Sequence, residues 1–121
     1  MIVGIGTDII EISRVVKACE NVNFLNRNFT LNEINLIQKD EKKSASNFAV
    51  KEAVSKVFGT GIRNFSLQDI EVLRDSFGKP YINLYGDAKN IARKLNIDQF
   101  HVSISNTKEI VIAYVIGEHI T

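Results

Sequence analysis

The longest predicted helix covers residues 44–58, which read SASNFAVKEAVSKVF and are followed by Gly59. On a helical wheel its alanines, valines and final phenylalanine form one broad apolar arc, the pattern of a helix packed against a core. Glycine is common just after a helix, so Gly59 predicts where this one ends. Lys51 and Ser55 fall opposite the arc, and we expect both side chains to face solvent.

Glu52 and Lys56 lie at the edge of this apolar arc, and their i, i+4 spacing places both on one face of the helix. One interpretation is an ordinary surface ion pair, worth about 0.3–0.5 kcal/mol. The other is that both groups border a site beside the core. The helix alone leaves the two interpretations open.

The segments around this helix predict a mixture of strands and further helices. β-branched residues indicate a strand over residues 2–12, in which two glycines permit close approach of another segment. Thr30 and Glu33 form a capping-box pattern that predicts a helix over residues 31–39. We also expect helices over 13–20 and 88–95, the second capped by Asp87, and strands over 66–74, 80–85, 99–105 and 109–118. These elements predict an α+β fold with a small mixed or antiparallel sheet packed with helices.

The last predicted strand is apolar at every position from residue 110 to 116. A strand of this kind is normally covered on both faces rather than on one. Helices of the same chain can supply the second cover, or a neighbouring subunit can. We favour a neighbouring subunit, and hence an oligomer.

The composition describes one compact domain over residues 1–121, with 45% hydrophobic residues and a formal net charge of +1. The small charge argues against nucleic-acid binding. No apolar run approaches the ~20 residues that span a membrane, and the first residues lack the features of a signal peptide. With a single cysteine, Cys19, expected to be an inert core thiol, these features predict a cytoplasmic protein without nucleic-acid or membrane partners.

The charge is unevenly distributed along the chain. Residues 14–63 hold nine basic and five acidic residues, so this stretch carries +4 and the remainder −3. Solvated helix faces would explain the asymmetry. A basic surface that meets an acidic partner or a phosphorylated ligand is the alternative.

Asp8 shares its parity in the first strand with Gly4 and Gly6, so in a regular strand its carboxylate points to an apolar face. Such a carboxylate needs a cation, a metal ion or N–H donors, unless it lies in a turn and bonds to its own backbone. Asp8 and Glu52 together could share one Mg²⁺ ion, which takes oxygen ligands from carboxylates and substrate phosphates. Lys56 would then neutralise charge on a transferring phosphoryl group.

Two loops carry residues that suit phosphate contacts. Gly59, Thr60 and Gly61 could present backbone N–H groups to a phosphate, although a helix end and a turn explain the same residues. The turn with Asn106 and Thr107 is an ordinary hairpin turn that could also bind phosphate. A Walker A pattern is absent, which disfavours a P-loop enzyme.

Three blocks in this order and spacing make the chain resemble the holo-[acyl-carrier-protein] synthases. They are residues 4–12 (GIGTDIIEI), 48–56 (FAVKEAVSK) and 102–109 (VSISNTKE), with shorter matches at 29–33, 59–61 and 78–80. The resemblance therefore runs over the full length of the chain.

The resemblance implies a 4′-phosphopantetheinyl transferase that moves the phosphopantetheine arm of coenzyme A to a serine of apo acyl carrier protein. Adenosine 3′,5′-bisphosphate is released, and the holo carrier serves fatty acid biosynthesis. The implied fold is α+β and trimeric, with active sites between subunits.

By motif match, Asp8 and Glu52 would bind Mg²⁺, and Glu52 and Lys56 would be catalytic, with Glu52 accepting the proton directly or through a water molecule. The implied coenzyme A contacts are Asp8, Lys56, Gly59, Thr60, Asn106 and Thr107. Arg14 matches a basic position that contacts the carrier protein, which the +4 stretch would attract.

Two positions depart from the family's usual pattern. Asn106 stands where a histidine is usual, and Asn47 where an arginine is common. An asparagine donates a hydrogen bond to phosphate but carries no charge, so we expect weaker coenzyme A binding with the chemistry kept. The alternatives to an active enzyme are a protein of the same fold that binds coenzyme A or carrier protein without turnover, and an unrelated nucleotide-binding or structural oligomer.

Overall fold

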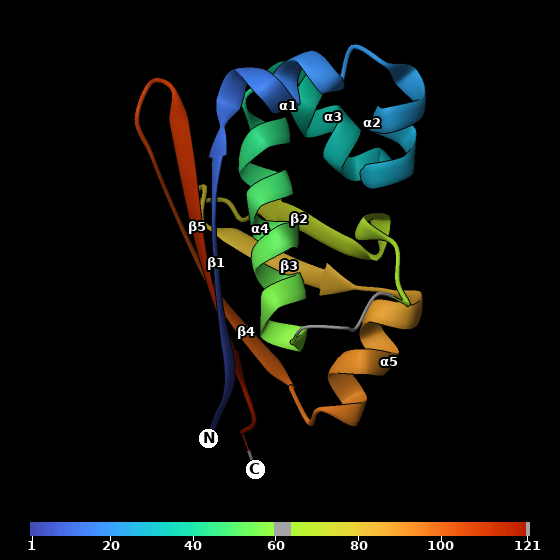
Figure 1. The fold of residues 1–121 in the computed structure, drawn as a ribbon, viewed down its shortest axis with the longest axis vertical. Coiled ribbons are helices and arrows are strands. Elements are labelled where there is room, and N and C mark those ends of the chain that lie inside the picture. Colours follow the sequence, from blue (N-terminus) through green and yellow to red (C-terminus); the bar gives the residue numbers. More distant parts are fainter. Residues whose placement is uncertain (60–63, 121) are drawn as a thin grey trace.

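The computed structural model describes residues 1–59 and 64–120, which form the α+β arrangement that the sequence predicts (Figure 1). The strands are β1 (Ile2–Glu11), β2 (Ile70–Arg74), β3 (Pro80–Leu84), β4 (Gln99–Asn106) and β5 (Ile110–Glu118). The helices are α1 (Ile12–Ala18), α2 (Val22–Asn28), α3 (Leu31–Lys39), α4 (Lys43–Phe58) and α5 (Gly86–Lys94), with a short 3-10 turn at Leu67–Asp69. Within the described ranges, no helix is long and apolar enough to cross a membrane.

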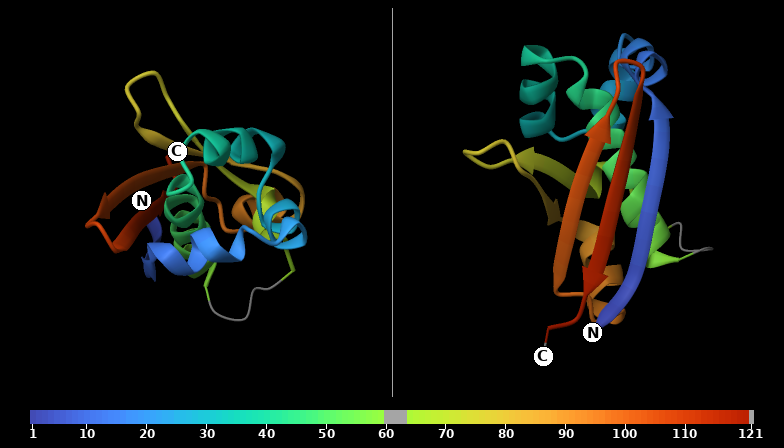
Figure 2. Two further views of the ribbon diagram at one scale, coloured as in Figure 1. Left: turned by 90° about the horizontal axis from the view of Figure 1, so that it is seen from above. Right: turned by 90° about the vertical axis from the view of Figure 1, so that its left-hand side faces the viewer.

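The strands form two antiparallel sheets, and α4 lies between them (Figures 1 and 2). The larger sheet has the order β1-β5-β4, so β5 is its central strand. The smaller sheet is the β2–β3 hairpin, which meets the opposite side of α4. The core consists mainly of the small apolar residues of α4 and the inner face of β5.

Two glycines of β1 allow α4 to lie directly on the larger sheet. A Cβ atom at Gly4 would lie 2.8 Å from the carbonyl oxygen of Val57, and one at Gly6 would overlap the carbonyl oxygen of Ala53. The close approach predicted for this strand is therefore confirmed, and it brings the backbone of α4 next to the strand that carries Asp8.

The predicted limits of the central helices are close to the observed ones. Thr30 accepts a hydrogen bond from the Glu33 backbone N–H, and Glu33 accepts one from that of Thr30, so the capping box of α3 is confirmed. Gly59 follows α4 with a positive φ of 100°, which favours glycine.

The prediction that Lys51 faces solvent is wrong, because its side chain is fully buried. Its ammonium group forms an ion pair with Glu33, with 2.8 Å between Nζ and Oε1. The wheel allowed α4 one buried face, but α3 and β2 pack against the face opposite β1. Ser55 is half-buried there, and its hydroxyl group donates to the backbone carbonyl of Lys51.

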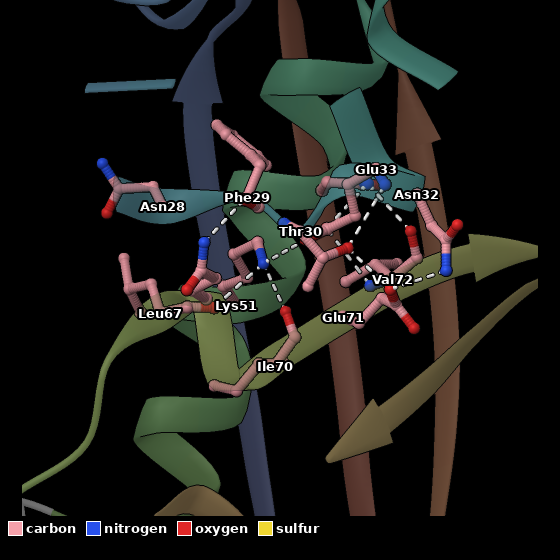
Figure 3. Close-up of polar contacts among 12 residues, drawn as sticks. Asn28, Phe29, Thr30, Asn32, Glu33, Lys51, Leu67, Ile70, Glu71 and Val72 are labelled. Carbon is pink, nitrogen blue, oxygen red and sulfur yellow. Dashed lines mark hydrogen bonds and ion pairs between the residues drawn. The ribbon is translucent and has the colours of Figure 1, made fainter. Parts of the chain in front are cut away.

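A second buried carboxylate, Glu71 of β2, belongs to the same polar region (Figure 3). Burial by itself would raise its pKa, but hydrogen bonds donated by four side chains hold the pKa below its usual value. The donors are Thr30, Asn83, Tyr85 and Asn32. Glu71 therefore ties the start of α3 to both strands of the small sheet.

No described segment of the chain covers the outer face of the larger sheet. Side chains of β5 alternate: Val111, Ala113 and Val115 are buried under α4, whereas Tyr114 is 55% exposed. On the neighbouring strand Ile5 and Ile9 point the same way and are 62% and 63% exposed. The described helices therefore cover only one face of the apolar strand.

Several local predictions need correction. Helix α2 was not expected, although Asn21 caps it by accepting hydrogen bonds from two backbone N–H groups. Residues 67–69 form a 3-10 turn instead of the start of a strand. Asp87 lies in the first turn of α5, and the N-cap is Tyr85, without a side-chain cap.

Candidate active site

Asp8, Glu52 and Arg14 line one cleft of about 600 Å³, although they come from β1, α4 and α1. The hydrophobic part of its lining includes Ile9, Ile10, Val15, Ala18, Phe24, Phe48 and Ile110. Phe24 and Phe48 stack there, with ring centroids 5.9 Å apart. Glu11 also lines the cleft, which therefore combines three carboxylates and a guanidinium group with an apolar wall.

Asp8 lies inside the regular ladder of β1, opposite Ala113 of β5, so the interpretation as a turn residue is wrong. Its side chain is 19% exposed and faces the side of the sheet that α4 covers. A carboxylate in this position needs a compensating group. That group is the ammonium of Lys56, whose Nζ lies 3.3 Å from Asp8 Oδ1.

Lys56 lies one helical turn beyond Glu52 on α4. Its Nζ also donates to the backbone carbonyl of Thr7, at 2.8 Å. The side chain is 56% exposed, so the ammonium group can be reached by a ligand from solvent.

The carboxylates of Asp8 and Glu52 suit a hard cation that takes its other ligands from a bound substrate and water. In the described part of the chain, no group of three or more His, Cys, Asp or Glu residues is arranged to hold a metal ion. Mg²⁺ typically uses only one or two protein carboxylates plus phosphate oxygens. The donor set of Asp8 and Glu52 fits that pattern.

Other predicted contacts are not brought to this cleft within one chain. Asn106 lies at the end of β4, beside the start of α4, in a separate pocket of about 130 Å³ that Lys42 and Ser46 also line. Gly59 lies at the opposite end of α4. Thr107 accepts hydrogen bonds from two backbone N–H groups of its own turn. Thr60 lies outside the described residues.

Asn47 is fully buried and does not reach the cleft. Its amide group donates to Glu33 and to the carbonyl of Val72, and its oxygen accepts from Arg74. These contacts explain the residue as part of the polar region between α4 and β2.

Cys19 is half-buried against the core, and burial raises the pKa of its thiol, with partial compensation by a hydrogen bond with Ser44. A raised pKa disfavours the reactive thiolate. This agrees with the expected inert thiol. Sequence reasoning missed Phe24 as part of the cleft, because it missed α2.

Comparisons with known proteins agree with one another. The sequence model described as the 4′-phosphopantetheinyl transferase superfamily matches residues 4–115. A holo-[acyl-carrier-protein] synthase of Lachnoclostridium phytofermentans is 61% identical over 118 residues, covering 98% of this chain and 97% of the relative.

Two solved structures of similar proteins contain a nucleotide ligand. A holo-(acyl-carrier-protein) synthase of Bacillus anthracis, in complex with CoA (3′,5′-ADP), is 38% identical with a TM-score of 0.79, covering 98% of both chains. A Helicobacter pylori holo-[acyl-carrier-protein] synthase in complex with coenzyme A is 32% identical with a TM-score of 0.82, covering 94% of this chain and 99% of that chain. The chain therefore belongs to the 4′-phosphopantetheinyl transferase superfamily and, within it, to the holo-[acyl-carrier-protein] synthases.

Proposed function

We propose that this chain is the Mg²⁺-dependent enzyme that transfers the 4′-phosphopantetheine arm of coenzyme A to a serine of apo acyl carrier protein, in fatty acid biosynthesis. The observation that carries the proposal is that Asp8 and Glu52 line one cleft and that Lys56 pairs with Asp8, in a chain of this family. The B. anthracis and H. pylori relatives form complexes with CoA (3′,5′-ADP) and coenzyme A, respectively, which supports coenzyme A as the substrate here.

In this proposal Asp8 and Glu52 hold Mg²⁺ against the pyrophosphate of coenzyme A. Their shared cleft supports this, and so does the finding that no three acidic, histidine or cysteine residues in the described ranges are grouped to hold a metal, which suits an ion completed by substrate oxygens. When bound, Mg²⁺ neutralises the negative charge of the pyrophosphate that otherwise repels the incoming hydroxyl group.

The transfer needs a positioned hydroxyl group, a proton acceptor and a cation near the leaving phosphate. The carrier serine oxygen forms a bond to the phosphorus that bears pantetheine, and the bond from that phosphorus to the bridging oxygen breaks. Glu52 accepts the serine proton, directly or through a water molecule. Lys56 contacts the phosphates through its exposed ammonium group, and adenosine 3′,5′-bisphosphate leaves.

Arg14 is the residue proposed to contact the carrier protein. Its side chain belongs to α1 and lines the same cleft as Asp8 and Glu52. A guanidinium group at this edge suits an acidic partner whose serine must enter the cleft. Attraction of this kind weakens as the salt concentration rises.

We also propose that the working unit is a homotrimer with active sites between subunits. The uncovered apolar face that includes Ile5, Ile9 and Tyr114 supports burial against another copy. The position of Asn106 and Thr107, away from the cleft of their own chain, supports a contribution from a neighbour. Analytical ultracentrifugation should give the trimer mass, and a monomer would contradict this proposal.

The test of the function is incubation with apo acyl carrier protein, coenzyme A and Mg²⁺, followed by mass spectrometry of the carrier. We expect a mass increase equal to the phosphopantetheine arm, lost with a chelator or in Glu52→Gln. Unchanged carrier mass, with coenzyme A still bound in a calorimetric titration, would instead show a binding protein of the same fold.

A further inference from the structure

Lys51, which precedes Glu52 on α4, forms a buried ion pair with Glu33 in a region that the proposed chemistry does not use (Figure 3). Both side chains are fully buried. The Lys51 ammonium group donates to Glu33 Oε1 at 2.8 Å, to the carbonyl oxygen of Leu67 at 2.9 Å, and to that of Ile70. All three of its N–H donors are therefore used inside the protein.

The Glu33 carboxylate is held equally firmly. Oε1 also accepts from the backbone N–H of Thr30 at 3.0 Å. Oε2 accepts from Asn47 Nδ2 at 3.0 Å and from the backbone N–H of Val72 at 3.2 Å. The pair thus joins α4 to the start of α3, to the turn before β2, and to β2 itself.

Burial of this ion pair costs free energy, and we expect the pair to contribute more to the orientation of α4 than to stability. Burial raises the pKa of Glu33 and lowers that of Lys51, and their mutual attraction compensates only in part. A well-packed apolar pair commonly stabilises a core as well as a buried ion pair does. A saturated set of directional hydrogen bonds, in contrast, admits one orientation of the helix that carries it.

Lys51 immediately precedes Glu52, so an orientation fixed at one residue is fixed at the next. On the other side of the helix, the contact of Gly6 with Ala53 sets the distance between α4 and β1. Because glycine has no side chain, this contact limits the distance between β1 and α4 but leaves rotation of α4 about its own axis less restricted. With side-chain ends about 5–6 Å from the axis, a rotation of about 10° moves the carboxylate of Glu52 by about 1 Å.

We propose that Lys51 is a positioning residue, which fixes the rotation of α4 through Glu33, Leu67 and Ile70 and so aims Glu52 and Lys56 at Asp8. This inference rests on the proposed transferase function. It assigns to the lysine beside Glu52 a role that needs no contact with substrate. A displacement of about 1 Å at reacting groups can reduce a rate about 100-fold, so the orientation fixed by Lys51 matters for turnover.

The experiment compares Lys51→Met with the double variant Lys51→Met/Glu33→Gln. The single variant leaves a buried carboxylate without its partner, and its urea midpoint should fall sharply. The double variant removes that charge, and its urea midpoint should recover toward the wild-type value. Ser55→Ala is the matched control, because it changes the same helical turn and leaves the ion pair intact.

In the double variant we expect kcat to stay about 10- to 100-fold below wild type, with the KM for carrier protein changed by less than about threefold. A role in stability alone predicts that kcat recovers together with the urea midpoint, and that result would overturn the inference. Calorimetric titration of Mg²⁺ in the presence of coenzyme A gives a readout independent of turnover, and should show weaker binding in the double variant. Wild-type protein without transfer activity would refute the proposed function itself, whereas active wild type with an equally active double variant refutes only the positioning role.

Discussion

Replacing Gly6 with alanine should separate β1 from α4 and so disturb the candidate site. A methyl group on Gly6 would overlap the carbonyl oxygen of Ala53 and lie 2.8 Å from its carbonyl carbon. Ordinary Cβ contacts begin at 3.4 Å, so the carbon alone requires a shift of ~0.6 Å, and the overlapping oxygen requires strand and helix to move apart further. Both contacted atoms belong to the backbone, which no side-chain rotation can relieve. Overpacking of this kind lowers the free energy of unfolding by about 1–3 kcal/mol.

The same displacement acts on the proposed chemistry. Asp8 follows Gly6 by two residues on the same strand face, and Glu52 directly precedes Ala53. Moving β1 from α4 therefore changes the separation of the two carboxylates. We expect the kcat of carrier modification, measured by mass spectrometry, to fall by about 10-fold or more, since reacting groups tolerate little misplacement.

Gly86→Ala is the matched control for this variant. Gly86 begins α5 with a φ of +52°, so alanine there is strained by about 1–2 kcal/mol without entering the contact between β1 and α4. Urea unfolding gives the stability of each variant, and the transfer assay gives its activity. If both variants lose activity only in proportion to their lost stability, the glycine contact does not position the site and the reasoning is refuted.

Three further predictions concern other parts of the molecule. The folded state holds the pKa of Glu71 below its unfolded value of 4.5, so its stabilisation is complete above pH 4.5 and is lost as the pH falls through the folded pKa. Urea titrations at several pH values should show that Glu71→Gln loses less free energy of unfolding in acid than wild type does. Equal losses would contradict this. Arg74 donates hydrogen bonds to Asn47 Oδ1 and Ser46 Oγ, so Arg74→Ala should lower the free energy of unfolding by about 1–3 kcal/mol. A change below about 0.5 kcal/mol would exclude a stabilising role for these bonds. Asn106→His should bind coenzyme A more tightly in a calorimetric titration, because a protonated imidazole adds positive charge, and equal affinity would remove Asn106 from the proposed contacts.

Local patterns predicted the elements with strong boundary residues. The Thr30–Glu33 capping box gave the observed limits of α3, and Gly59 gave the end of α4. Helix α2 was missed because it is only seven residues long and no side chain of it is fully buried, so it has little apolar periodicity. Its one usable feature was Asn21, a residue typical of helix N-caps.

The burial of Lys51 could not be read from the helix that contains it. A helical wheel shows which residues share a face, but only the fold shows that β2 and α3 cover the face opposite β1. Glu33 lies 18 positions away along the chain and was noted only as part of a cap. A charged residue opposite an apolar arc is ordinarily exposed, so a buried partner from another segment had no sequence pattern of its own.

Parity and helical phase singled out two residues that the structure brings together. Asp8 interrupted an apolar strand face, and Glu52 lay at the edge of an apolar arc; the structure places both in one cleft. Lys56 had been assigned to the phosphates, and the structure adds its ion pair with Asp8. That ion pair joins residues 48 positions apart and depends on the packing of α4 against β1, which spacing along the chain does not encode.

The residues proposed to contact coenzyme A are divided between the two ends of α4, and this division bears on the oligomer. Asn106 lies beside the first turn of the helix and Gly59 follows its last. Sixteen residues at 1.5 Å per residue separate these ends by about 24 Å. A second copy seated on the uncovered sheet face would bring its own Asn106 to the molecule without any change in the fold of either chain. The apolar strand β5 and the divided contacts then have one common cause, because the surface that buries Tyr114 would also complete the site.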